Sequence, residues 1–451
     1  LVVALPAGFR AEHIPGGGPD NVLVHGSQGT VENWDWLVAL SPMVDGAVLS
    51  CSEYPHDELA KKETMSVKPK IMTVYGTRPE AIKVAPVVSV LQNDDRFDSV
   101  VVSTGQHREM LEQVNKRFGI TPDHDMALMK PGQTLNELVA RAIQGLDPII
   151  EEEKPDVIIS QGDTSTAMVA ALAGFHKGVR VVHLEAGLRT GNIFSPFPEE
   201  ANRKIIGQIT SLHLAPTNES RENLRRENFR SKDIVVTGNT VIDALLAASE
   251  WDVQFDDSRL EKLRNSDEKL VLVTTHRREN LDAMKKIGGA VQDLAKSYPD
   301  HIFALPLHLN PKVRDSVLPE VEDLPNVIIT DPLPYDQFTA LMSRAYLVLT
   351  DSGGVQEEAP SLGKPVLVMR ENTERPEAVV AGTVKLVGTD RDLIVAEARN
   401  LLDQDAAYEA MANAVNPYGD GKAAERAVAA IAELVGVGER IGEFEPEIDH
   451  K

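Results

Sequence analysis

Short apolar runs alternate with helix-like stretches along the chain from Lys70 onward. In the first half, runs rich in β-branched residues are each followed by a segment with helical spacing; these runs are IMTVY, SVVVST, DVIIS, RVVHLE, SLHLAP and DIVVTG. A polar, charge-rich stretch over residues 251–269 interrupts the alternation, and KLVLVTT, HIFALPL, NVIIT, YLVLT and PVLVM restart it. Strands that alternate with helices form parallel sheets, so we predict an α/β protein with two doubly wound Rossmann-like domains facing a cleft. Ligands of such sheets bind at the carboxyl ends of the strands.

The same pattern divides the chain. We expect an extension over residues 1–67, a first Rossmann-like domain over 68–245, a second over 246–428, and a C-terminal helix with an acidic tail over 429–451. Glycines and prolines interrupt the extension, whose role we leave open. Because the chain begins with Leu1 and Met65 stands just ahead of the first strand, our hypothesis is that the extension is upstream sequence from an early start. The tail from Gly436 is expected to be loosely held surface.

Composition and charge narrow the class of protein. A chain of 451 residues with 42% hydrophobic and 25% charged residues is typical of a soluble protein with more than one core. The formal net charge of -23 argues against nucleic acid or an anionic membrane as a partner, so an anionic ligand needs a locally basic pocket. Cys51 is the only cysteine, which excludes an intrachain disulfide and fits the cytoplasm. The sequence predicts neither a signal peptide nor a membrane anchor.

Residues 70–85, KIMTVYGTRPEAIKVA, join an apolar strand to an amphipathic helix. N–H groups at a helix N-terminus lack partners within the helix, Gly76 permits a tight turn, and Pro79 suits the first helical turn. Arg78 and Lys83 add positive charge. The junction therefore predicts a phosphate-binding site; the structural alternative is an ordinary strand-to-helix turn with solvated cations.

Residues 347–360, LVLTDSGGVQEEAP, repeat the order of strand, glycine turn and helix. Ser352, Gly353 and Gly354 offer hydroxyl and backbone donors at a helix N-terminus, which predicts a second phosphate site. Glu358 lies one turn into this helix, where it is placed to accept hydrogen bonds from ribose hydroxyls. Its structural alternative is an ordinary helix glutamate.

Two further residues suit a nucleotide. Arg375 follows the last core strand and would add charge to the same diphosphate, and Phe338 is an aromatic residue that would stack on a base. The chain contains neither a Walker loop nor the GxGxxG dinucleotide fingerprint. This weakens kinase and nicotinamide interpretations.

Carboxylates follow neighbouring strands of the first predicted sheet. Asp163 comes after the strand DVIIS, Glu185 ends the next strand, and Glu199 opens the helix after Pro198. Each has a structural alternative, such as a helix N-cap for Asp163 or a partner for the helix dipole at Glu199. Like charges gathered in a cleft raise one another's pKa, so we expect an acid and a base near neutrality.

His276 occupies the corresponding strand end of the second domain, beside Arg277 and Arg278. A histidine there would protonate or bind a diphosphate leaving group, whereas the alternative is a capping or surface residue. No second histidine or cysteine lies at metal-ligand spacing, so we predict no metal site.

From about Lys70 to Gly421 the chain contains, in order, the motifs GTRPEAIKVAP, TGQHREML, QGDTSTA, HLEAGLRTG, PFPEEANR, GNTVIDAL, THRREN, PLHLNPKVR, TDSGGVQEEAPSLGKPVL and TERPEAV. Taken together, these motifs resemble those of the non-hydrolysing UDP-N-acetylglucosamine 2-epimerases. The resemblance implies a GT-B-type fold, a homodimer, last helices that cross back onto the first domain, and no metal or nicotinamide cofactor. It also implies interconversion of UDP-N-acetylglucosamine and UDP-N-acetylmannosamine by elimination and re-addition of UDP through 2-acetamidoglucal, feeding cell-surface polysaccharide synthesis.

The resemblance also implies roles for individual residues. The family's acids and bases fall on Asp163, Glu185, Glu199 and His276. Its UDP contacts fall on Arg78, Lys83, Phe338, Ser352, Gly353, Gly354, Glu358 and Arg375. Leu333 departs from members that hold a glutamine near the uracil. Because family members are often activated by their own substrate at a second site that involves the QHRE segment, Gln106, Arg108 and Gln113 are candidate allosteric residues.

Three alternatives stay open. A GT-B glycosyltransferase shares the fold but would require an acceptor and would not need the three carboxylates. A hydrolysing epimerase would release free N-acetylmannosamine and UDP. A non-catalytic UDP-sugar sensor would bind without turnover, against which the complete acidic set argues. The sequence does not assign base and acid among Asp163, Glu185 and Glu199.

Overall fold

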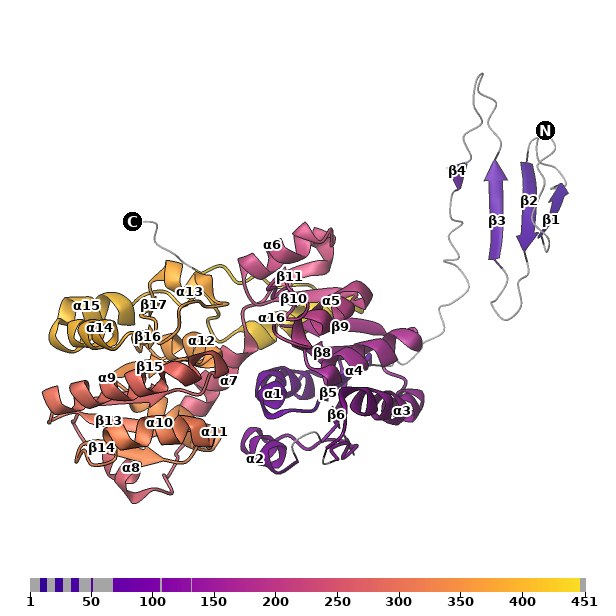
Figure 1. Cartoon of the computed structure of the whole chain (residues 1–451). Helices are drawn as coiled ribbons and strands as arrows, with labels where there is room; N and C mark the ends of the chain where they lie inside the picture. The colour runs from indigo at the N-terminus through magenta and orange to yellow at the C-terminus, as the bar shows by residue number, and fades with distance from the viewer. Residues whose placement is uncertain are drawn as a thin grey trace. The chain divides into compact units, whose positions relative to one another are not determined.

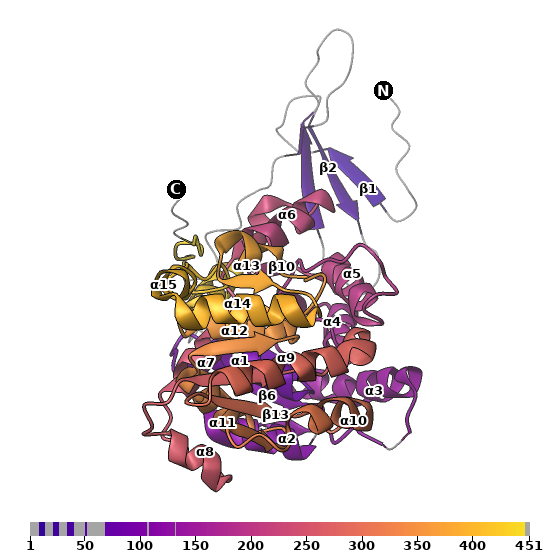
Figure 2. The same cartoon turned by 60° about the vertical axis from the view of Figure 1, so that its left-hand side comes forward.

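The computed structural model describes residues 9–13, 21–26, 34–39, 50–51, 68–105, 108–130 and 132–446 (Figures 1 and 2). Side chains are described from Lys68 onward, apart from residues 106–110, 131 and 278. The chain divides into two compact units, Leu1–Val67 and Lys68–Lys451.

The smaller unit contains an antiparallel sheet that the sequence analysis did not foresee. Its strands pair in the order β1-β2-β3-β4. The strands are β1 (Phe9–His13), β2 (Asn21–Gly26), β3 (Trp34–Ala39) and β4 (Ser50–Cys51).

In the larger unit, the described residues form two parallel sheets, each at the centre of a lobe. The first lobe has the order β11-β10-β9-β8-β5-β6-β7, and the second has β14-β13-β12-β15-β16-β17. The first set is β5 (Lys70–Tyr75), β6 (Asp98–Ser103), β7 (His124–Asp125), β8 (Val157–Gln161), β9 (Arg180–Leu184), β10 (Leu212–Ala215) and β11 (Ile234–Val236). The second set is β12 (Leu270–Thr274), β13 (Ile302–Pro306), β14 (Val327–Thr330), β15 (Leu347–Thr350), β16 (Val366–Val368) and β17 (Val384–Leu386). The predicted α/β class with two parallel sheets is confirmed.

Helices cover both faces of each sheet (Figures 1 and 2). Those from the first half are α1 (Arg78–Gln92), α2 (Arg108–Phe118), α3 (Leu135–Glu153), α4 (Ser165–His176), α5 (Glu199–Ile209), α6 (Asn218–Arg226), α7 (Thr240–Ser249) and α8 (Ser258–Leu263). The others are α9 (Met284–Ser297), α10 (Pro311–Val321), α11 (Tyr335–Arg344), α12 (Gly353–Ser361), α13 (Pro376–Ala381), α14 (Arg391–Asp403), α15 (Asp405–Ala412) and α16 (Ala423–Leu434). Short 3-10 turns occur at Ser231–Asp233 and Arg278–Ala283.

The period of two along a strand explains how one sheet serves two core layers. In β5, Ile71 packs in the layer that contains α1, whereas the next residue, Met72, packs in the layer with α3 and α4. Both residues are fully buried, as a strand inside a parallel sheet requires. The continuous apolar run IMTVY read from the sequence is therefore a central strand.

Helices α7 and α16 connect the parts of the larger unit. Helix α7 contacts α1 of the first lobe and α11 and α12 of the second, and α16 packs on α1, α7 and β10. The expectation that the tail after Gly436 is loosely held is wrong as far as residue 446. Phe444 is buried and donates its N–H to the carbonyl of Val236 at 2.8 Å, because its ring fills an apolar site beside β11.

Candidate active site

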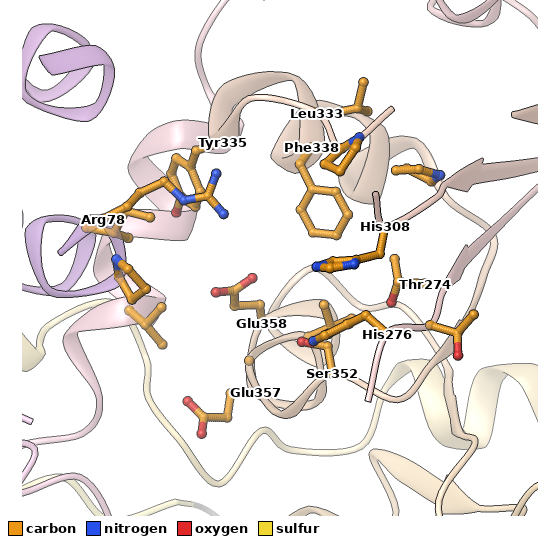
Figure 3. A pocket seen from close by; sticks show the side chains of 18 of the residues that line it. Arg78, Thr274, His276, His308, Leu333, Tyr335, Phe338, Ser352, Glu357 and Glu358 are labelled. Atoms are coloured by element: carbon orange, nitrogen blue, oxygen red, sulfur yellow. The ribbon is translucent and has the colours of Figure 1, made fainter. Parts of the chain in front are cut away.

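A cavity of about 450 Å³ lies between α1 and the carboxyl ends of the strands in the second sheet (Figure 3). Strand ends supply Thr274 to His276, Pro306 and His308, Pro332 and Leu333, and Ser352 with Gly354. The first lobe supplies Arg78, Pro79, Ile82, Lys83 and Val241. The cavity is thus at the sheet edge where ligands of doubly wound folds bind.

The structure gathers the predicted UDP contacts around this cavity. Arg78, Lys83, Phe338, Ser352, Gly354, Glu358 and Arg375 line it. Gly353 lies directly behind, since a Cβ added there would be 2.8 Å from Nη1 of Arg375. In Figure 3 the Arg78 side chain enters from one side and the rings of Phe338 and His308 from the other. Leu333, where some family members hold a glutamine, also lines the cavity.

The first predicted phosphate site differs from expectation at its backbone. The N–H groups of Gly76 and Thr77 donate to the Glu80 carboxylate at 3.1 and 2.7 Å, and Thr77 caps α1 in return. This capping box uses the N–H groups of Gly76, Thr77 and Glu80 within the protein, so these three donors are not directed at a ligand. Only the side chains of Arg78 and Lys83 carry charge into the cavity from this junction.

The second predicted site keeps its backbone donors available. Ser352 is the N-cap of α12 but makes no side-chain capping bond, so the first turn of this helix offers N–H groups without a side-chain acceptor. The guanidinium groups of Arg375 and Arg277 both lie close to Gly353. A side chain at Gly353 would displace them, which explains a glycine here on steric grounds.

Glu185 forms a buried ion pair with Lys83, with 2.5 Å between Nζ and Oε1. Gln161 donates to the other carboxylate oxygen at 2.6 Å. Glu185 has φ = 64°, an unusual conformation for a residue other than glycine, which is often found at functional sites. Burial raises the pKa of Glu185, but Lys83 outweighs it, and the net direction is downward. The expectation of an elevated pKa is therefore wrong for Glu185.

Burial and charge act in opposite directions on Lys83 as well. Burial lowers the pKa of the ammonium group, and the charges of Glu185 and Glu357 more than compensate, so the pKa is raised. Both members of the pair are consequently charged at neutral pH.

Asp163 follows β8, and Glu185 follows the adjacent strand β9, as the sequence analysis expected. Asp163 is not the N-cap of α4; Thr164 caps that helix by accepting from the N–H of Ala167 at 3.0 Å. The Asp163 carboxylate instead accepts a hydrogen bond from Nε of Arg203 at 2.8 Å and forms an ion pair with Nη2 of the same residue at 2.7 Å. The helix-cap alternative for Asp163 is thus excluded.

Glu199 begins α5, and its Oε2 is buried without a hydrogen-bond partner within the described part of the chain. A buried carboxylate oxygen without a donor is costly unless a ligand or water supplies one. None of Asp163, Glu185 and Glu199 lines the cavity, but Glu185 is bonded to Lys83, which does.

His276 follows β12 and stacks on the ring of His308 with centroids 5.8 Å apart. Behind it, the buried carboxylate of Asp351 lies 3.4 Å from Nδ1 and accepts from the backbone N–H groups of His276 and Arg277. Partial burial lowers the pKa of His276, and Asp351 opposes that shift. Asp351 therefore holds the loop that carries the histidine.

Glu358 points into the cavity (Figure 3). Burial and the neighbouring charge of Glu357 raise its pKa to about 7. Glu358 is thus the carboxylate of this site that titrates near neutrality.

Sequence reasoning missed several polar residues that connect these groups. They are Gln161, Asn239, His308, Asp351 and Glu357. Four of them lie at or just after strand ends, the signal that found Asp163 and His276, so the same criterion applied to every strand would have included them.

The predicted regulatory residues are only partly described. Gln106 and the side chain of Arg108 lie outside the described residues, and Gln113 is exposed on α2. Among the residues whose positions are described, no cluster of three or more His, Cys, Asp or Glu side chains is arranged to hold a metal ion. Across the same residues, no helix is long and apolar enough to cross a membrane.

The fold and the cavity define a two-lobed α/β protein of the GT-B type with its ligand site between the lobes. The family model for UDP-N-acetylglucosamine 2-epimerase matches residues 89–432. The chain is 51% identical over 368 residues to the UDP-N-acetylglucosamine 2-epimerase of Escherichia coli (strain K12), a match that covers 80% of this chain and 98% of the relative. The chain belongs to the UDP-N-acetylglucosamine 2-epimerase family.

Solved structures of two similar proteins support the same family assignment. The enzyme from Neisseria meningitidis bound to UDP-GlcNAc is 46% identical, with a TM-score of 0.73, over 81% of this chain and 100% of that one. The Methanocaldococcus jannaschii enzyme in complex with UDP-GlcNAc and UDP is 30% identical, with a TM-score of 0.66, over 82% of this chain and 100% of that one.

Proposed function

We propose that this protein interconverts UDP-N-acetylglucosamine and UDP-N-acetylmannosamine without hydrolysis. The observation that carries the proposal is the bond between a residue of the cavity wall and a candidate catalytic carboxylate. A cavity with cationic and aromatic walls suits a nucleoside diphosphate, and Lys83 in its wall is bonded to Glu185, one of the three candidate carboxylates. Membership in the family supports the same substrate.

The chemistry is an elimination followed by an addition. A base removes the proton from carbon 2 of the sugar as the bond between carbon 1 and the diphosphate oxygen breaks, which gives 2-acetamidoglucal and UDP. The oxygen of UDP then adds back to carbon 1 while carbon 2 receives a proton on the opposite face. This sequence needs a base, an acid on the other face, and positive charge for the leaving diphosphate.

We assign these tasks by charge and position. Glu185, kept ionised by Lys83, is suited to act as a base. Arg78, Arg375 and His276 would stabilise the charge that develops on UDP, together with the first N–H groups of α12. Phe338 would contact the base, and Glu358 would accept from the ribose hydroxyls.

Incubation of the purified protein with UDP-N-acetylglucosamine alone in deuterium oxide tests the proposal. We expect the manno epimer with deuterium at carbon 2, and slow release of UDP and 2-acetamidoglucal. Epimer without solvent deuterium would contradict proton abstraction. Free N-acetylmannosamine as the main product would favour a hydrolysing epimerase, turnover only with an added acceptor a glycosyltransferase, and binding without turnover a sensor.

The three carboxylates have a matched test. We expect Asp163→Asn, Glu185→Gln and Glu199→Gln each to lower turnover by at least about 100-fold, the low end for a lost acid or base, with a smaller effect on UDP affinity. A variant with near-normal turnover would return its residue to a structural role.

We also propose a homodimer that acts in the cytoplasm. Apolar side chains exposed on the loop before α5 and on α5, including Phe194, Phe197 and Ile205, support a self-association surface. The single cysteine supports a reducing compartment. Mass determination of the wild type and of Phe194→Ser would test the surface, with a monomeric wild type contradicting it.

Activation by substrate through Gln106, Arg108 and Gln113 is proposed on the resemblance alone; a sigmoidal rate curve that becomes hyperbolic in Gln113→Ala would support it.

A further inference from the structure

Asn239 makes a contact to each lobe with a single amide group. Its Nδ2 lies 3.3 Å from Oε1 of Glu185 in the first lobe and 2.9 Å from Oε2 of Glu357 in the second. The side chain is buried, with 3% of its surface exposed. One NH₂ group carries two hydrogens, so Asn239 has one donor for each carboxylate.

The orientation of this amide is determined by the backbone. Asn239 is the N-cap of α7, and its Oδ1 accepts from the N–H of Val241 at 3.1 Å. The opposite orientation would point Nδ2 at that N–H and Oδ1 at two carboxylates, which is unfavourable at every contact. Its own backbone N–H donates to the carbonyl of Tyr418 at 2.6 Å. The amide is therefore held rigidly between the two acids.

Each acid is also bonded to a cation of the site. Glu185 pairs with Lys83, and Glu357 pairs through Oε1 with Nε of Arg375 at 2.5 Å. Lys83 and Arg375 both line the cavity. Asn239 thus stands at the centre of a chain that runs from a carboxylate of the first lobe to a cation of the nucleotide site in the second.

We propose that Asn239 is a positioning residue that joins Glu185 to the Glu357–Arg375 pair across the two lobes. The inference rests on the proposed function insofar as Glu185 is taken there to act in catalysis. Helix α7, which begins at this residue, packs against helices of both lobes, so the bridge lies at the element best placed to maintain their spacing. Asn239 does not line the cavity, and its effect on the reaction passes through the two acids.

Substitutions that retain the helix cap separate this role from simple capping. Asparagine, aspartate and serine are comparable N-caps, so Asn239→Asp and Asn239→Ser should keep α7 intact. Serine can donate to only one of the two carboxylates, and aspartate donates to neither and adds negative charge. Asp390→Asn, the same exchange in reverse at the N-cap of α14, is the control.

The first readout is the pH dependence of kcat. A hydrogen bond donated to a carboxylate favours its ionised form, so loss of the Asn239 donor should move the acid limb of the profile to higher pH, further for Asn239→Asp than for Asn239→Ser. The charged and titratable side chains that act on Glu185 in the wild type are Lys83, His183, Arg203 and Arg375, and Glu357 acts on its partner Lys83. All of these remain in the variants. We expect kcat at neutral pH to fall by at least about 10-fold, the effect of a hydrogen bond to a charged group. Asp390→Asn should not change the profile.

The second readout needs no turnover. Without the Asn239 donor, the Glu357 carboxylate attracts Arg375 more strongly, and Arg375 is less available to the diphosphate. We therefore expect Asn239→Ser to weaken UDP binding by about 3- to 10-fold in calorimetry. In a Glu357→Gln background the same substitution should have little effect. If the wild type does not epimerise, the proposed function is wrong. The UDP affinities of Asn239→Ser in the wild-type and Glu357→Gln backgrounds would then still test the bridge. An acid limb that is unchanged in Asn239→Asp, or equal UDP effects in both backgrounds, would overturn the bridge while the function stands.

Discussion

At the scale of single residues, the charge of each carboxylate depends on its closest neighbour. Glu185 and Glu358 are both partly buried near the cavity, yet their pKa values move in opposite directions. Lys83 is bonded to Glu185, whereas Glu358 has Glu357 beside it. A cation favours the charged form and a second carboxylate disfavours it, which accounts for the difference.

Lys83→Met tests the importance of the cation beside Glu185. Without it, burial would raise the pKa of Glu185 and leave the carboxylate protonated near neutrality. We expect kcat at pH 7 to fall by about 100-fold and to recover partly as the pH rises. Steady-state rates from pH 5.5 to 9 would show this, with the exposed Lys68→Met as control. A rate loss that is equal at every pH would contradict the electrostatic explanation.

Glu358 should make UDP binding depend on pH. With a pKa of about 7, the free carboxyl is mostly protonated at pH 6 and mostly ionised at pH 8. Ribose hydroxyls that donate to it require the ionised form, so affinity should increase over this interval by about 5- to 10-fold. Calorimetry with Glu358→Gln provides the reference, because the ionisation of UDP itself is common to both proteins. An affinity that decreases relative to that reference would exclude Glu358 as the ribose acceptor.

At the scale of elements, local pattern located the strands that are formed by apolar runs but missed two others in the larger unit. Every apolar run named from the sequence forms a strand, whereas β7 (His124–Asp125) and β17 (Val384–Leu386) were missed. Neither HD in β7 nor VKL in β17 is a continuous apolar run, and the strand geometry of both segments depends on pairing with β6 and β16. The hydrogen bonds that attach α16 to the first lobe likewise cannot be predicted from a local sequence pattern.

Asp243 connects α7 to the N-terminus of α16 and should make stability depend on pH. Its carboxylate accepts from the N–H groups of Ala423 and Ala424 at 3.2 and 2.8 Å, and burial raises its pKa to about 6. A folded-state pKa above the unfolded value of about 3.9 contributes stability that is present at low pH and lost as the pH rises through 6. Relative to Asp243→Asn, the wild type should therefore lose about 1–2 kcal/mol between pH 5 and 7.5. Denaturant unfolding at both pH values measures this, and a constant difference would contradict it.

At the scale of the whole molecule, the larger unit contains both sheets and the cavity. The division between units falls at Val67 and Lys68, and the match to the Escherichia coli relative covers 98% of that protein while using 80% of this chain. The residues argued to act in catalysis and binding all lie in the larger unit.

A chain that starts at Met65 should therefore fold and epimerise like the full chain. We expect kcat within about 2-fold of that of the full chain and an unfolding midpoint of the larger unit within a few degrees, since the described residues that line the cavity all lie in the larger unit. Activity assays and calorimetric scans of both proteins provide the comparison. Loss of activity or aggregation of the shorter chain alone would show that residues 1–64 are a structural requirement.

The sequence by itself determined the α/β class, the positions along the chain of the strands formed by apolar runs, and the strand ends that carry Asp163, Glu185 and His276. These follow from local periodicity, because a parallel sheet places all its carboxyl ends at one edge. Only the tertiary structure decided which side chains pair with one another. Lys83 and Glu185 are 102 positions apart, and Asn239 and Glu357 are 118 apart, so no local pattern relates them. Protonation states depend on those partners: packing placed an ammonium group against Glu185 and a second carboxylate beside Glu358, and that arrangement decided which acid stays ionised.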